Sequence, residues 1–149
     1  MLVGIKQTDK ELLEPIQKYG CLFLCFAYSS PFNFEGELGR LALNHLWHKA
    51  LENSIISKNY IVLNHNKLAE LFKLNARYDD MHHSAEEKIP SKVKFVFGEY
   101  VYEGSHFVIL SKDKKVIFDP YGKSNTVAKG KLYSMRWYYD NQRIKGKSR

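Results

Sequence analysis

Hydrophobic and polar positions divide the chain into two halves of different character. In the first half, residues 21–29 form an apolar run without a charge, and apolar residues recur near a 3.6-residue period over 37–53. A run that is apolar on every side cannot lie on a surface, so we predict a buried central helix over 21–29 and an amphipathic helix over 37–53. Shorter pieces flank these two: an amphipathic stretch at 9–17 with Pro15 inside it, an extended stretch at 55–63, and a helix that begins at Asn64 or Asn66.

The second half, after Pro90, is rich in β-branched and aromatic residues and predicts an antiparallel sheet. Its predicted strands are 93–97, 99–102, 106–110, 116–119 and 135–139. Between the halves, residues 77–90 are polar without periodicity, which predicts a long surface loop that covers or frames a site. Helices followed by strands predict an α+β fold.

Length and composition predict one domain over residues 1–149. A chain of 149 residues with 44% hydrophobic composition is large enough to bury a core without a metal or a disulfide. The chain opens without a signal peptide and has no apolar run long enough to span a membrane, so we expect a cytoplasmic protein with no membrane partner.

The net charge of +7 favours polyanionic partners, either nucleic acid or anionic cell-wall polymers. Basic residues are densest at 143–149, which we interpret as a solvated terminus. The aromatic residues at 137–139 are better explained by a final strand than by base stacking, so a nucleic-acid partner is not expected.

Cys21 is the first residue of the predicted buried helix and directly follows Gly20. Unpaired backbone N–H groups and the positive end of the helix dipole stabilise a thiolate at this position, which makes the sulfur a better nucleophile. Cys25 lies one turn further into the apolar run, and we assign it to core packing. Two cysteines four residues apart on one helix form a poor disulfide, so both are expected to be free thiols.

Residues 106–119 predict a hairpin that brings an imidazole and a carboxylate together. With a two-residue loop at 112–113, His106 faces Asp119 directly, close enough for a hydrogen bond. A loop one residue longer would move the carboxylate to the other face. The apolar pairs of the predicted register are Phe107 with Phe118 and Ile109 with Val116.

Three motifs in this order resemble the papain-like cysteine peptidase superfamily. They are Gly-Cys at the start of an apolar helix, Gly-Ser-His-Phe-Val-Ile-Leu in a strand, and Asp-Pro-Tyr-Gly after the next strand. The sequence is especially similar to the double-glycine leader peptidases and their relatives in bacteria and phages, over about residues 17–122. The resemblance implies a helical half packed on an antiparallel sheet, with the active site in the cleft between them.

The same resemblance implies a role for four residues. Cys21 would be the nucleophile, His106 the general base and Asp119 the group that orients the imidazole. Gln17 would be the oxyanion donor, although its spacing of four residues from the cysteine is shorter than the family's usual pattern. Acyl transfer needs such a set, with N–H donors where the oxyanion forms, and it needs no cofactor.

Three functions are compatible with these residues. The first is a thiol hydrolase that cleaves a peptide or protein, and the second is an amidase or endopeptidase acting on peptidoglycan stem peptides, which the positive charge suits. The third is a catalytically inactive relative that serves as a binding module, since Cys21, His106 and Asp119 are each unremarkable when taken alone. No metal is predicted, because the spacings of His45, His48, His82 and His83 match no zinc pattern.

Overall fold

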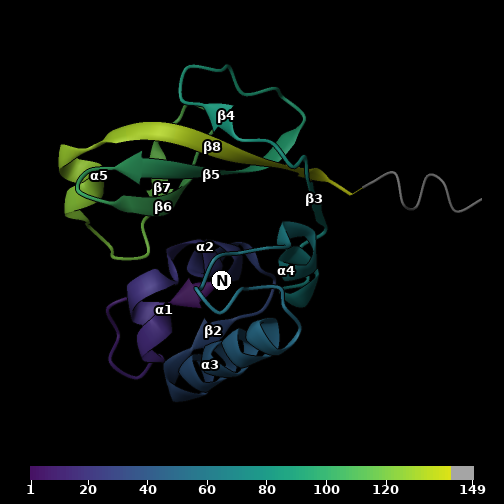
Figure 1. Cartoon of the computed structure of the whole chain (residues 1–149), viewed down its shortest axis with the longest axis vertical. Coiled ribbons are helices and arrows are strands. Elements are labelled where there is room, and N and C mark those ends of the chain that lie inside the picture. The colour runs from purple at the N-terminus through teal and green to yellow at the C-terminus, as the bar shows by residue number, and fades with distance from the viewer. Residues whose placement is uncertain (142–149) are drawn as a thin grey trace, which may run out of the picture.

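A helical layer and a sheet layer lie against each other in the computed structural model, which describes residues 1–141 (Figure 1). The prediction of an α+β fold is confirmed at this level. The prediction for the basic run at 143–149 lies outside the described residues. The helices are α1 (Glu14–Tyr19), α2 (Cys21–Ser29), α3 (Gly36–Glu52), α4 (His65–Leu71) and α5 (Asn125–Lys129).

Six strands form one antiparallel sheet in which β8 is paired on both sides. The strand order is β3-β8-β5-β6-β7, and β4 also pairs with β8. A separate parallel pair, β1 (Leu2–Val3) with β2 (Phe34–Glu35), lies on the helical side. The six strands are β3 (Ala76–Tyr78), β4 (His83–Ser84), β5 (Val93–Val101), β6 (Ser105–Leu110), β7 (Val116–Phe118) and β8 (Lys131–Asp140).

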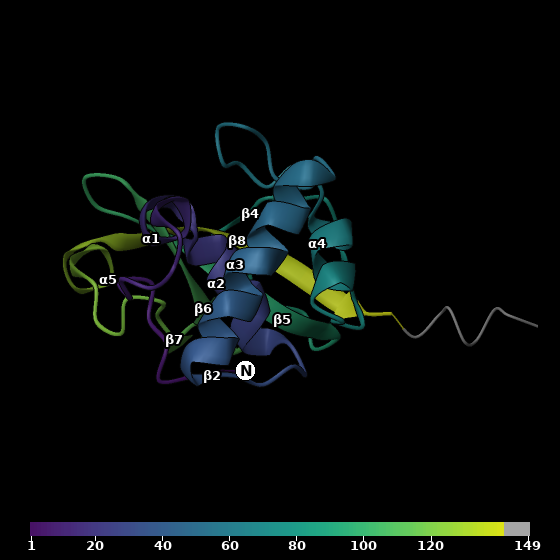
Figure 2. The same cartoon turned by 90° about the horizontal axis from the view of Figure 1, so that it is seen from below.

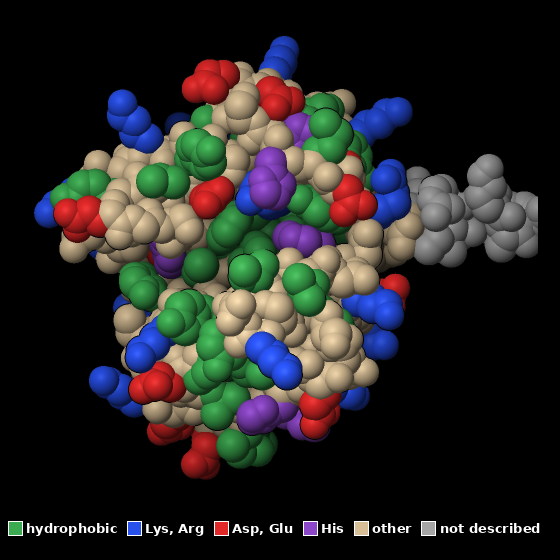
Figure 3. All heavy atoms as spheres, viewed as in Figure 1, with side chains coloured by type: hydrophobic (Ala, Val, Ile, Leu, Met, Phe, Trp, Pro, Cys, Tyr) green, Lys and Arg blue, Asp and Glu red, His purple; other side chains and the backbone are tan. Residues whose placement is uncertain are grey.

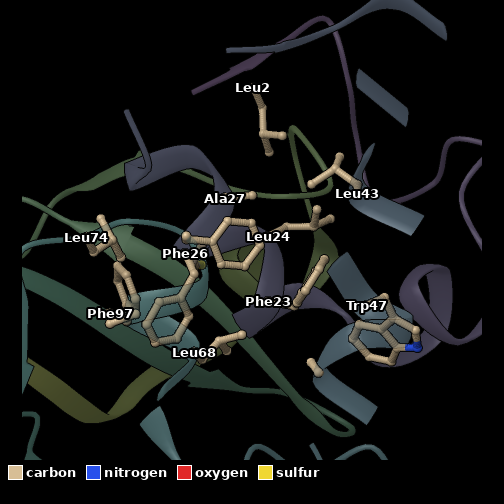
Figure 4. Close-up of a cluster of buried hydrophobic side chains, with 14 of the residues drawn as sticks. Leu2, Phe23, Leu24, Phe26, Ala27, Leu43, Trp47, Leu68, Leu74 and Phe97 are labelled. Atoms are coloured by element: carbon tan, nitrogen blue, oxygen red, sulfur yellow. The ribbon is translucent and has the colours of Figure 1, made fainter. Parts of the chain in front are cut away.

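Helix α2 has the predicted bounds and lies in the centre of the core. Its side chains point toward both layers (Figure 4). Phe26 contacts Phe97 of the sheet with ring centroids 5.2 Å apart, while Phe23 contacts Trp47 of α3 at 5.0 Å. Seen from below, α3 runs across the helical layer with the sheet behind it (Figure 2). Burial on both sides explains why the α2 sequence is apolar all round.

The other helices differ from their predicted bounds by a few residues. The predicted piece at 9–17 is replaced by α1, which starts later and carries Pro15 in its first turn, where a missing N–H costs nothing. The predicted helix over 37–53 corresponds to α3. The side chain of Asn64 caps α4 by accepting a hydrogen bond from the N–H of Lys67. The stretch at 55–63 contains one bridge, between Ile56 and Val62.

One prediction about the strands of the second half was wrong. We predicted separate strands on either side of Gly98, whereas β5 runs through it without interruption. An added Cβ at Gly98 would lie 2.6 Å from a side-chain carbon of Leu110, so this glycine allows close packing rather than a turn. Residues 77–90, predicted as a long surface loop, are mostly loop, but two short strands interrupt them: the end of β3 and all of β4, both paired with β8.

The hairpin register was also predicted incorrectly. The turn is one residue longer than expected, because the N–H of Ser111 bonds to the carbonyl of Lys115 at 2.8 Å. A bulge between Ile109 and Leu110 shifts the register by one more residue, so Phe118 faces Ile109 instead of Phe107. Side chains alternate along a strand, and a total shift of two residues therefore keeps Asp119 on the face predicted for it.

Candidate active site

Gly20 and Cys21 form the junction between α1 and α2. A Cβ on Gly20 would lie 2.5 Å from the carbonyl oxygen of Ile16, so only glycine lets the two helices approach this closely. Cys21 is the first residue of α2 and is half-buried, whereas Cys25 is fully buried. Both thiols are free, as predicted. The tight junction fixes Cys21 at the positive end of the central helix.

The Cys21 sulfur meets the beginning of β6. The backbone N–H of Phe107 points at Cys21 Sγ over 3.4 Å, and the His106 side chain interacts with the same thiol. Phe107 and Cys21 are 86 positions apart in the sequence. The structure thus brings the predicted nucleophile and the predicted base together across the two layers.

His106 is buried and bonded to Asp119, with 2.7 Å between Nε2 and Oδ1. Burial lowers the pKa of His106, but hydrogen bonds and negative charge from Asp119 and Cys21 outweigh it and raise the pKa to about 9. With Nε2 occupied by the carboxylate, Nδ1 is the ring nitrogen left for the thiol. The ring of Tyr121 packs beside the imidazole at 4.8 Å between centroids.

Asp119 is held by a set of donors from the turn that follows it. Its Oδ1 also accepts from the N–H of Tyr121 at 2.9 Å, and its Oδ2 accepts from the N–H and hydroxyl of Ser124 at 3.1 and 2.7 Å. Burial raises the pKa of Asp119, but the bonds from His106, Ser124 and Tyr121 bring the pKa below its ordinary value. The carboxylate is therefore ionised and fixed in orientation before any ligand arrives.

Within residues 1–141, the side chain of Gln17 makes no hydrogen bond to Cys21, His106 or Asp119. Its carboxamide donates to the carbonyl of Leu12 at 2.8 Å, and Gln17 is absent from the lining of the cavity beside Cys21. A different glutamine, Gln7, is buried and donates through Nε2 to the carbonyls of Ile16 and Gln17 at 3.1 and 3.0 Å. Its backbone N–H bonds to the carbonyl of Pro120 at 2.8 Å, so Gln7 links α1 to the turn after Asp119.

A cleft of about 380 Å³ opens beside Cys21 between the two layers. Figure 3 shows a hollow between these layers in which hydrophobic and histidine side chains gather. The helical side of the cleft is mainly apolar, and the sheet side is polar. The lining residues are Lys18, Tyr19, Cys21, Leu22, Asn59, Tyr60, Ile61, Val62, His65, His82, Ser105, Phe107 and Arg136.

The histidines other than His106 have separate surroundings. His45 and His48 lie exposed on α3, His65 bonds to the Tyr138 hydroxyl at 2.7 Å, and His83 is bound by two carboxylates. Among residues 1–141, no three His, Cys, Asp or Glu side chains are arranged to hold a metal ion. Over the same residues, every helix is too short or too polar to cross a membrane.

Three residues of this site escaped the sequence reasoning. Gln7 lies in a polar opening segment, Ser124 follows the Asp-Pro-Tyr-Gly turn, and Arg136 lies inside a run that reads as an ordinary strand. A Ser five residues after the predicted orienting Asp is the one available signal, since Ser is a preferred N-cap and α5 begins at the next residue.

A family model matches almost all of the described chain, residues 1–140, under the description "Protein of unknown function, DUF261". The chain belongs to this family. The DUF261 match spans both layers and includes Cys21, His106 and Asp119. No curated protein and no solved structure matches the chain significantly.

Proposed function

We propose that this DUF261 protein is a cysteine hydrolase of the papain-like kind, which cleaves a peptide or amide bond through an acyl-enzyme at Cys21. The observation that carries the proposal is the convergence of three chain segments: the start of α2, the start of β6 and the turn after β7. A thiol, an imidazole and a carboxylate meet there in the order that nucleophilic acyl transfer requires.

In the proposed reaction, His106 takes the proton of the Cys21 thiol, and the resulting thiolate attacks the substrate carbonyl carbon and forms a tetrahedral oxyanion. His106 then gives a proton to the amine as the carbon–nitrogen bond breaks, which leaves a thioester on Cys21. A water molecule, which loses a proton to His106, attacks the thioester and releases the carboxylic acid and the Cys21 thiolate, which leaves His106 protonated. The raised pKa of His106, about 9, keeps the imidazolium populated at neutral pH for the proton transfer to the amine.

Backbone groups supply the oxyanion donors in this proposal. Cys21 lies in the first turn of α2, where an N–H has no carbonyl of its own helix to bond. Gln17 is a weak candidate for the second donor, because its carboxamide is bonded to Leu12. Asp119 keeps Nε2 of His106 as the bonded nitrogen, so that the opposite side of the ring faces the thiol.

Selective alkylation tests the proposal. Iodoacetamide at neutral pH is expected to modify the native protein once, with the label lost in Cys21→Ala and retained in Cys25→Ala. Burial raises the pKa of Cys25 well above its ordinary value, so this thiol serves as the matched unreactive control on the same helix. Equal labelling of both cysteines, or no labelling of Cys21, would contradict the proposal.

The substrate is tested in parallel with a peptide library and purified peptidoglycan. Release of new amino groups from peptides that disappears in Cys21→Ala supports a peptidase. Release from peptidoglycan alone supports the wall amidase or endopeptidase, which the net charge of +7 suits. If neither substrate is cleaved although Cys21 is accessible, the binding-module alternative takes precedence.

A further inference from the structure

The sheet face that packs on the helices changes from apolar to charged over two residues. Phe97 of β5 pairs with both Ile109 of β6 and Arg136 of β8, so these three side chains share one face. At the α2 end of that face, Phe97 contacts Phe26. One step further along the strands, Glu99 pairs with Phe107 and with Ser134, and here the face borders the cleft.

Arg136 is the charged residue of this face that lines the cleft beside Cys21. Only 6% of its surface is exposed, and its guanidinium carbon lies 5.2 Å from the ring centroid of Phe107. The backbone N–H of Phe107 in turn points at the Cys21 sulfur. Phe107 therefore contacts both the Arg136 guanidinium, through its ring, and the proposed nucleophile, through its N–H.

The donors of Arg136 are only partly used within residues 1–141. Its Nη1 donates to the Ser134 hydroxyl at 2.8 Å and to the Met135 carbonyl at 3.5 Å. Its Nη2 lies 3.6 Å from Glu99 Oε1, an ion pair beyond good hydrogen-bond length, and that oxygen accepts from the Ser134 hydroxyl at 2.7 Å. A guanidinium has five N–H groups in a planar fork, so donors remain for an acceptor in the cleft.

The rest of the cleft lining contains no competing negative side chain. No Asp or Glu lies among its residues in the described part of the chain, and Lys18 adds a second positive charge at its edge. His65, on the opposite side, is neutral at pH 7: burial first, then the charges of Arg136 and His82, lower its pKa to about 4. Arg136 is thus the buried fixed charge of the cleft.

We propose that Arg136 binds a carboxylate of the substrate next to the scissile bond. The substrate class is therefore peptides that carry either an acidic residue or a free C-terminal carboxylate at that place. Arginine pairs with carboxylates through two parallel hydrogen bonds, and such pairs are strengthened where water is largely excluded. The catalytic part rests on the proposed function, whereas the carboxylate site does not.

The first test needs no substrate and compares two alkylating agents at Cys21. Iodoacetate carries a carboxylate, and iodoacetamide is its neutral counterpart. We expect the iodoacetate-to-iodoacetamide rate ratio at Cys21 to exceed that of free cysteine, and to fall about tenfold in Arg136→Met. Arg136→Lys keeps the charge without the fork and is expected to retain part of the ratio. A ratio equal to that of free cysteine would overturn the proposal.

Two further measurements separate binding from a structural role of Arg136. Glu99→Gln removes the protein's own carboxylate beside Arg136, and the rate ratio is expected to stay the same or rise. A fall to the Arg136→Met value would overturn the proposal, since it would make the ion pair itself the cause. In the unmodified protein, N-acetylglutamate should slow iodoacetamide labelling more than N-acetylglutamine, and equal protection would also count against the site.

Peptide cleavage distinguishes the two sources of carboxylate. Pairs of peptides with Glu or Gln at each position around the bond test the side chain, and free-acid against amidated C-termini test the chain end. A preference of about tenfold or more for one acidic arm, lost in Arg136→Met, supports the proposal. Cys21-dependent cleavage without an acidic preference overturns the carboxylate site and leaves the hydrolase intact. Anion-selective alkylation without any cleavage overturns the hydrolase and leaves the carboxylate site intact.

Discussion

Within residues 1–141, two histidines are bound to carboxylates, and they differ in which ring nitrogens remain free. His83 is bonded at both nitrogens, with Nε2 2.7 Å from Asp79 and Nδ1 3.0 Å from Glu87. Its ring stacks on Trp137 with centroids 3.4 Å apart. His106 is bonded to one carboxylate through Nε2, and the thiol of Cys21 lies at its other side.

A carboxylate beside a histidine therefore does not by itself make that histidine a base. Burial lowers the pKa of His83, but bonds and charge from Asp79 and Glu87 raise it above its ordinary value, as Asp119 and Cys21 do for His106. With both nitrogens occupied, His83 has no site left for a substrate proton. Its role is to attach the segment at 77–90 to the sheet.

Replacing each histidine in turn is expected to give the largest effect. His106→Ala should lower kcat/KM of Cys21-dependent hydrolysis about 10³-fold or more, because both proton transfers are lost. His83→Ala should change it less than about threefold, because its ring contacts no cleft residue of the proposed mechanism. Similar losses of activity in the two variants, once circular dichroism shows both to be folded, would contradict this difference between the two histidines.

Replacing one carboxylate in each cluster sharpens the contrast. The alkylation rate of Cys21 should show a limb near pH 9, where the His106 imidazolium loses its proton. Asp119→Asn should lower kcat/KM about 10²-fold and move this limb to lower pH. The reason is that the Asp119 carboxylate helps to raise the pKa of His106. Asp79→Asn is the matched control, and its alkylation profile should stay in place. An unchanged limb in Asp119→Asn would show that this carboxylate does not hold the imidazolium.

Stability should depend on pH through His83. Because its pKa is raised by folding, the charged ring stabilises the fold fully below the unfolded value of about 6.5, and this contribution is lost as pH rises through the folded pKa. His83→Gln should therefore reduce the free energy of unfolding by about 1 kcal/mol at pH 6. Urea titrations should show a smaller deficit at pH 9, and a deficit that grows with pH would contradict the assignment.

The smallest effect is expected for Gln17. If its carboxamide stays on the Leu12 carbonyl, Gln17→Ala should lower kcat less than about threefold. An oxyanion donor would cost about 10²-fold or more. Steady-state kinetics on one peptide separates these values, and a loss of the larger size would restore the role implied by the family resemblance.

The parts of the site that the sequence predicted depend on local pattern. Helix α2 was predictable because its apolar run has no charge, and the position of Cys21 at its start was predictable because the run begins there, directly after Gly20. The contact of His106 with Asp119 was predicted from a register that proved wrong by two residues, and it survived because a shift of two restores the same face.

The parts that escaped prediction depend on contacts distant in sequence. Gly98 reads as a break until Leu110 of the neighbouring strand is known to pack against it. The two short strands within residues 77–90 were not predicted because the pairing of β3 and β4 with β8 has no local signature. The position of Arg136 beside the cleft could not be predicted, because its contacts with Phe107 and Glu99 come from two other strands.

The Ser124 hydroxyl makes two hydrogen bonds, which couple the Asp119 carboxylate to helix α5 outside the cleft. It donates to Asp119 and also accepts the N–H of Val127, which closes the first turn of α5. Amide hydrogen exchange at Val127 should therefore report remotely on whether the carboxylate is in place, from a helix that lines no part of the cavity. The exchange rate of the Val127 amide, followed by NMR, would therefore report the position of the Asp119 carboxylate without any added reagent.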